Sequence, residues 1–194
     1  MGSELEELIV ADAAAWRRWL DRHHDERPGV WLVLAKKGAS EVTSLTHEQA
    51  LLEALCFGWI DGQLRRGDER AYRQRFTPRK PRSAWSKRNV ELAERLLTEG
   101  RMRAAGRAAI ERAREDGSWQ AAYAGSATIE VPDDLAAALA AQPEAAAMFE
   151  RLTSQNRYSI LYRLATAKRP ETRTRRLDQY VAMLVRGETI HPQR

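Results

Sequence analysis

The sequence has little cysteine, few histidines and no long apolar run, and each shortage excludes a class of protein. Its single cysteine, Cys56, cannot form an intramolecular disulfide, which suits a reducing compartment. No run of 18 apolar residues is present, so no membrane-spanning helix is expected. The first ten residues are acidic and short of apolar length, unlike a secretory signal. These features predict a cytoplasmic protein that does not enter a membrane.

Motifs for metals, cofactors and nucleophilic catalysis are also missing. The four histidines include no pair spaced four residues apart, and a second thiolate ligand does not exist, which argues against a metal site. Cys56 lies in the apolar stretch "LLEALCFGWI", where burial favours core packing over catalysis. The chain contains no G-x-S-x-G, no Walker pattern and no G-x-G-x-x-G. No cofactor is therefore expected, and whether the protein catalyses a reaction stays open.

What the sequence does have is one concentrated basic segment. The 194 residues carry a net charge of +5, whereas residues 65–88 hold ten Lys or Arg and two acids, a local charge of +8. The rest of the chain therefore sums to −3. Such a concentration favours an anionic partner, which would be a phosphate, a carboxylate or a nucleic acid. The alternative is a solvated basic face without a ligand.

Periodicity predicts a mixed first half and a helical second half. Helices are expected at 11–24 and 47–57, and strands at 30–35, 59–64 and 71–77, the last two as a hairpin. Thr46 and Gln49 form a capping box at the start of the second helix. From residue 86 onward only helices are expected. The fold class is thus α+β: a small antiparallel sheet of about three strands packed with helices (1–120), then an all-helical C-terminal region (121–194) packed on it.

Asp61, in the stretch "WIDG", is the most informative acid. It follows Trp59 in a predicted strand and precedes Gly62. A carboxylate in that setting is costly unless it is paired, and the next strand offers Arg73 and Arg75 as partners. The pair would either fix the hairpin or present an acid that contacts a ligand or moves a proton. Asp61 is therefore the candidate catalytic residue, and Gly62 either turns the strand or allows a ligand close to the backbone.

The stretch "QRFTPRKPRSAWSKRN" could form the other half of a site. Proline fixes the backbone beside two arginines, whose guanidinium forks match phosphate and carboxylate. A helix starting near Ser86 would point free N–H groups at the same place. Taken singly, Ser86 could be a plain helix cap and Trp85 a plain core residue. The candidate ligand-binding residues are Trp59, Gly62, Arg75, Arg79, Ser83, Trp85, Ser86 and Asn89.

The same stretches carry a family resemblance. "LTHEQALLEALCFGWIDGQ", "QRFTPRKPRSAWSKRN" and the C-terminal "VPDDLAAALAAQPEAAAMFERLTSQNRYSILYRLATAKRPETRTRRL" resemble the YdeI/OmpD-associated family. The resemblance covers roughly residues 10–192 and includes W-I-D-G, Q-R-F-x-P-R and S-x-W-S-x-x-N elements. Members of that family are often labelled bacteriocin-protection proteins. The resemblance implies a role in stress or antimicrobial protection and supplies no catalytic residues.

Three functions fit these observations. The first is binding of a small, anionic molecule in a pocket of Asp61 and the 75–89 segment. The second is nucleic-acid binding, supported by the basic charge and by Tyr72, Phe76 and Trp85, although no reading motif is present. The third is a stress protein that binds a partner through its C-terminal helices and the basic stretch 167–176. The ligand and the oligomeric state are not determined by the sequence.

Overall fold

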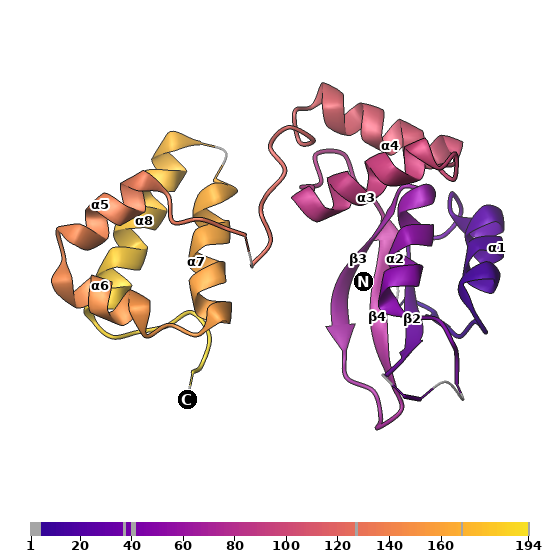
Figure 1. Cartoon of the computed structure of the whole chain (residues 1–194), viewed down its shortest axis with the longest axis horizontal. Helices are drawn as coiled ribbons and strands as arrows, with labels where there is room; N and C mark the ends of the chain where they lie inside the picture. Colours follow the sequence, from indigo (N-terminus) through magenta and orange to yellow (C-terminus); the bar gives the residue numbers. More distant parts are fainter. Residues whose placement is uncertain (1–4, 37, 40–41, 127, 168, 194) are drawn as a thin grey trace. The chain divides into compact units, whose positions relative to one another are not determined.

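The computed structural model describes residues 5–36, 38–39, 42–126, 128–167 and 169–193. The chain divides into two compact units, one of residues 1–85 and 89–121 and the other of residues 86–88 and 122–194. Figure 1 shows a sheet with its helices in the first unit and helices α5–α8 in the second. The predicted α+β class is confirmed.

The first unit contains a four-stranded sheet in the order β1-β2-β4-β3. The long strands are β2 (Val30–Ala35), β3 (Trp59–Arg65) and β4 (Ala71–Pro78), and they pair antiparallel. The sequence predicted about three strands. The fourth is β1 (Glu7–Leu8), which pairs parallel to β2 at the edge and is too short to show an alternating pattern.

Two helices with well-formed N-termini cover one face of this sheet. Helix α1 (Ala13–His23) is capped by Asp12, whose carboxylate accepts from the Ala15 N–H at 2.7 Å. Helix α2 (His47–Cys56) begins with the predicted capping box of Thr46 and Gln49. Between these helices and the sheet lies an aromatic cluster, in which the Trp16 ring is 6.2 Å from Trp59 and 5.8 Å from Phe76.

Helices α3 (Lys87–Thr98) and α4 (Ala104–Glu115) lie across one end of the sheet (Figure 1). Helix α4 meets the end of α2 at Gly106, where an added Cβ would sit 2.3 Å from the Cys56 carbonyl oxygen. The same carbonyl accepts from the Arg103 N–H at 3.0 Å. Gly58 ends α2 with φ +73, a left-handed conformation that glycine adopts without strain. The close approach at Gly106 requires glycine and joins α4 to α2.

A buried carboxylate reinforces the same junction. Glu53 of α2 is 7% exposed and accepts from Arg17 of α1 at 2.5 Å and from Arg101 at 2.6 Å. Arg17 also hydrogen-bonds Cys56, and the two arginines partly retain contact with water. Because a buried carboxylate is costly without such partners, this clamp fixes α1, α2 and the start of α4 together.

The second unit is a helical bundle with its own core. It consists of α5 (Asp133–Ala140), α6 (Pro143–Glu150), α7 (Ser154–Ala165) and α8 (Pro170–Val185). Its core side chains include Leu135, Phe149, Ile160, Leu164, Tyr180 and Leu184. Asn156, 1% exposed, ties the C-terminal segment to α7, because its side chain pairs with both the N–H and the carbonyl of His191.

We expect the Glu53→Gln variant to lower the free energy of unfolding by about 3 kcal/mol, because two arginine charges lose their carboxylate. Urea unfolding followed by tryptophan fluorescence measures the change. The control is Glu99→Gln, which removes an exposed partner of Arg101 and should cost less than about 1 kcal/mol. Equal effects of the two substitutions would show that the clamp contributes no more than a surface pair.

Asn156→Ala should cost about 2 kcal/mol, because the backbone groups of His191 lose their partners. Chemical denaturation monitored by circular dichroism tests this. Gln155→Ala, an exposed neighbour on the same helix, is the control and should change stability by less than about 0.5 kcal/mol. A loss no larger than that of the control would contradict the anchoring role.

Burial raises the pKa of the Cys56 thiol, and the hydrogen bond from Arg17 only partly opposes this shift. The raised pKa keeps the thiol protonated at neutral pH, as the apolar sequence context predicted. We expect the native protein to react with a thiol reagent at least about 100-fold more slowly than the unfolded chain at pH 7.5. Fast labelling of the native protein would mean that Cys56 is an accessible thiolate.

Candidate functional site

Asp61 is paired with a histidine rather than with an arginine. Its carboxylate oxygen lies 3.0 Å from Nε2 of His47, the first residue of α2. The expected partners, Arg73 and Arg75, are on the other face of the sheet. Asp61 pairs in register with Phe76, and neighbouring residues of a strand point to opposite faces. Arg73 instead forms an ion pair with Glu7 of β1.

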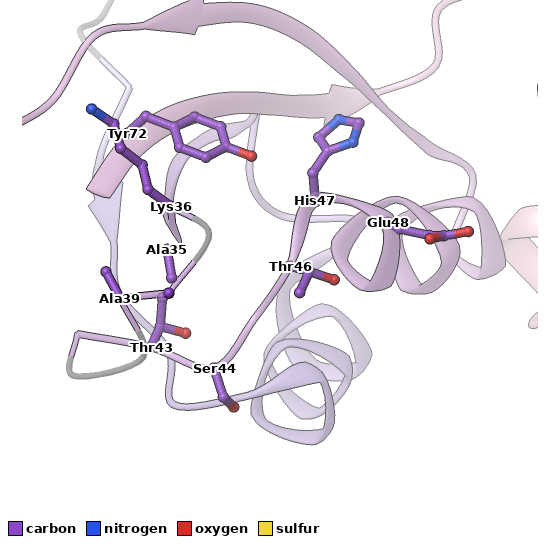
Figure 2. Close-up of a pocket in the computed structure, with 10 residues that line it drawn as sticks. Ala35, Lys36, Ala39, Thr43, Ser44, Thr46, His47, Glu48 and Tyr72 are labelled. Carbon is purple, nitrogen blue, oxygen red and sulfur yellow. The ribbon is translucent and has the colours of Figure 1, made fainter. Parts of the chain in front are cut away.

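His47 of this pair lines a surface hollow of about 850 Å³. Figure 2 shows the Tyr72 hydroxyl pointing across this hollow toward the His47 ring. Burial raises the pKa of Tyr72, so its hydroxyl stays protonated and can donate a hydrogen bond. The hollow is lined by Ala35, Lys36, Gly38, Ala39, Thr43, Ser44, Thr46, His47, Glu48 and Tyr72.

Most other polar groups around the hollow already have partners. The Thr43 hydroxyl donates to the Val10 carbonyl at 2.6 Å, and the Ser44 hydroxyl donates to the Ala11 carbonyl at 3.1 Å. The Lys36 ammonium donates to the Asp68 carbonyl at 2.7 Å and retains its charge at the rim. Among the residues that the structure describes, the Tyr72 hydroxyl has no such partner, which leaves it available to a ligand.

The arrangement can orient and exchange a proton. A histidine ring that bonds a carboxylate through one nitrogen is held in a fixed orientation, and its other nitrogen is available as a donor or an acceptor. Tyr72 adds a hydroxyl on the same face of the sheet. Three metal-binding side chains do not gather at this or any other place in the described part of the chain.

Sequence reasoning missed His47 and Tyr72 as site residues. His47 lies 14 residues before Asp61, and only the way α2 packs on the sheet brings them together. One signal was available: the capping box places His47 at the first position of a helix, at the end that faces the sheet. Tyr72 lies on the same face of β4 as Gln74 and Phe76, because side chains alternate along a strand.

Three of the predicted ligand-binding residues lie close together: Arg79, Ser83 and Trp85. They do not line the hollow at His47. The Arg79 guanidinium stacks on the Trp85 ring at 3.6 Å and donates to the Ala84 carbonyl at 3.2 Å. Trp85 packs edge-on against Trp119 at 4.7 Å. With α4, these residues line a cavity of only about 10 Å³, which has room for about one water molecule.

The connector at this cavity is itself held in an unusual conformation. Arg82 has φ +60, which is rare for a residue with a side chain. Its N–H donates to the Asp116 carboxylate at 3.0 Å. The contact holds the 79–85 connector against the end of α4.

The remaining predicted site residues are dispersed. Trp59 is buried in the aromatic core, and its indole N–H donates to the His24 carbonyl at 2.9 Å. Gly62 lies at a β-bulge, where its carbonyl accepts from the Gln74 amide at 2.8 Å. Arg75 lies on the opposite face of the sheet from Asp61.

The last two predicted residues lie at the start of α3. Ser86 forms a bridge to Tyr123 within the second unit. Asn89 is buried and belongs to the first unit. The two residues thus fall in different units of the chain.

The basic stretch 167–176 carries internal contacts in the second unit. Arg173 binds both carboxylate oxygens of Asp134, at 2.7 and 2.8 Å, and donates to the Leu164 carbonyl. Arg176 donates to the Arg163 carbonyl at 2.5 Å. Lys168 lies outside the described residues. These arginines donate to carbonyls in the last turn of α7.

Comparisons with known proteins divide the chain in two. Residues 8–109 match the family model described as "Domain of unknown function (DUF8412)", and this part includes Asp61, His47 and the three short motifs. Residues 128–187 match the model described as "Bacteriocin-protection, YdeI or OmpD-Associated". Neither a curated protein nor a solved structure matches the chain. No helix of the described residues is long and apolar enough to cross a membrane. The chain therefore belongs to the DUF8412 family through its first unit, and it carries a domain of the bacteriocin-protection, YdeI or OmpD-associated family at residues 128–187.

Proposed function

We propose that the first unit binds a small anionic molecule in the hollow lined by Tyr72 and His47, where Asp61 orients the His47 ring. The observation that carries this proposal is the Tyr72 hydroxyl, which faces His47 across the hollow without a partner among the described residues (Figure 2). The volume of about 850 Å³ lies within the range of small-molecule sites. A ligand here would meet hydrogen-bond donors, a condition that suits a carboxylate or a phosphate.

The charges near the hollow favour an anion as well. Lys36 places an ammonium at the rim, whereas Glu48 points away from the other labelled side chains in Figure 2. The Asp61 carboxylate is bonded to His47 and is not among the lining residues, so the imidazole rather than this carboxylate faces a ligand. The family of the second domain suggests that this binding serves protection against bacteriocins or other antimicrobial compounds.

Acid–base catalysis is the second candidate, and the His47–Asp61 hydrogen bond favours it. A histidine oriented by a carboxylate is a frequent general base, with Tyr72 on the same sheet face as a possible proton donor. Binding and turnover separate cleanly in a test: Asp61→Asn would retain the hydrogen bond to His47 but lower a proton-transfer rate about 100-fold or more. Unchanged product formation in that variant would exclude His47 as the base.

A thermal-shift screen at low and high salt tests the binding proposal. The compounds are phosphates, carboxylates, nucleotides, amino acids and antibiotics. A compound that binds the native state at 100 times its Kd stabilises it by about 2.7 kcal/mol, which raises the unfolding temperature by roughly 5 °C or more. We expect such a shift for at least one anion, and we expect it to persist in high salt because the site is partly buried.

The variant Tyr72→Phe, which removes one hydroxyl, should weaken binding of that anion about tenfold. The matched control is Tyr158→Phe in the second unit, where a half-buried tyrosine loses the same group. Arg79→Ala tests the pocket predicted from the 75–89 segment. Loss of binding in Arg79→Ala with normal binding in Tyr72→Phe would move the site to the cavity at Trp85 and overturn this proposal.

A further inference from the structure

The face of the sheet opposite His47 carries an unusual concentration of arginine. Arg73 and Arg75 of β4 point to this face, because they alternate with Gln74 and Phe76. Arg65 of β3 pairs in register with Arg73 and joins them. The β-bulge between Asp61 and Leu64 is what brings Arg65 to this side: one extra residue in β3 reverses the face of every position after it.

An aromatic ring lies among these arginines. Trp31 of β2 pairs in register with Arg75, and the Arg65 guanidinium stacks on its ring at 4.0 Å. Trp31 itself is only 6% exposed, whereas Arg65 is exposed. The inner face of the Arg65 guanidinium stacks on the rigid indole. Its outer planar face is therefore available to a ligand.

The two groups border a hollow with a net positive charge. Its volume is about 590 Å³, and its lining comprises Leu5, Glu7, Trp31, Arg65, Arg66 and Arg73. Among the described residues of this lining, three arginines and one glutamate give a charge of +2. Arg73 is paired with Glu7, so its guanidinium has a fixed position but is already partly neutralised. Arg66 is exposed, and its guanidinium can follow a phosphate.

Arg75 extends the charged surface beyond the hollow. Its buried Nε lacks a hydrogen-bond acceptor among the described residues. Its stem runs beside Gly62 of β3, because its Cβ and Cδ lie 3.9 Å from the place where a side chain at Gly62 would begin. Part of the basic charge of residues 65–88 thus lies around the Trp31 ring. The residues are Arg65, Arg66, Arg73 and Arg75.

We propose that this face binds single-stranded nucleic acid, with one base stacked on the Arg65–Trp31 pair and the flanking phosphates on Arg66 and Arg73. Planar guanidinium and indole groups stack on any base, and arginine forks bind phosphate oxygens. A duplex keeps its bases inside the helix, so it could offer this face only its phosphates. The chemistry therefore selects an unpaired strand. The site is independent of the anion proposed for Tyr72, because the two lie on opposite faces of the sheet.

Fluorescence anisotropy with a labelled 12-nucleotide poly(dT) strand tests the proposal on the full-length protein. The second probe is a DNA hairpin with a stem of 12 base pairs. We expect the single strand to bind at least tenfold more tightly than the duplex at 50 mM salt. The two phosphate contacts predict a fall in affinity of roughly sevenfold between 50 and 200 mM salt.

Arg65→Lys separates stacking from charge, because lysine keeps the positive charge and loses the planar group. We expect this variant to bind the single strand at least about fivefold more weakly, in line with the contribution of one stacked base. Its control is Arg18→Lys, an exposed arginine of α1, which should change affinity less than twofold. Both sites are exposed, so the variants should unfold within about 1 °C of the wild type.

Three results would overturn the proposal. The first is no anisotropy change at 50 mM salt. The second is equal affinity for the single strand and the duplex, which would mean a phosphate-binding surface without base stacking. The third is an equal effect of Arg65→Lys and Arg18→Lys, which would assign the binding to general charge.

Discussion

The buried carboxylate of Glu53 is the constraint on which the first unit depends. It lies in the last half of α2 and binds arginines from α1 and from the segment that precedes α4. A carboxylate that is 7% exposed is tolerated only because both oxygens are occupied. Next to it, Gly106 lets α4 approach the Cys56 carbonyl closely. The C-terminal end of α2 is thus fixed by charge and by close backbone packing at the same time.

This anchoring determines where the candidate site lies. Helix α2 has ten residues and is about 15 Å long, so fixing its C-terminal end and its face on the sheet also fixes His47 at the other end. The capping box stops the first turn from fraying, and Asp61 receives the imidazole. The position of His47 therefore depends on a rigid helix whose opposite end is fixed. This is the arrangement in which a hydrogen bond between two side chains can orient a ring reliably.

The sequence predicted local structure well and long-range pairing poorly. Thr46 and Gln49 were predicted as a capping box, and β2 was predicted with its observed bounds because it is a continuous apolar run. The prediction of an arginine partner for Asp61 was wrong. An aspartate in a hairpin suggested a cross-strand arginine, whereas the register places Phe76 opposite Asp61 and the arginines on the other face. Register depends on where the bulge falls, and a strand pattern of seven residues does not specify that.

Charge by itself was also an ambiguous guide, as the two basic stretches show. In the second unit, Arg173 and Arg176 lie beside the last turn of α7 and donate to its carbonyls. Their charge thus has a structural use within the bundle. In the first unit, Arg65 and Arg66 are exposed, and among the described residues that line their hollow the one acid, Glu7, is paired with Arg73. A cluster of arginines without matching acids is costly in self-repulsion, and an anionic ligand relieves that cost. The two basic stretches differ in the hydrogen-bond acceptors that surround their arginines. We therefore expect an external anion to bind at Arg65 and Arg66 rather than at the 167–176 stretch.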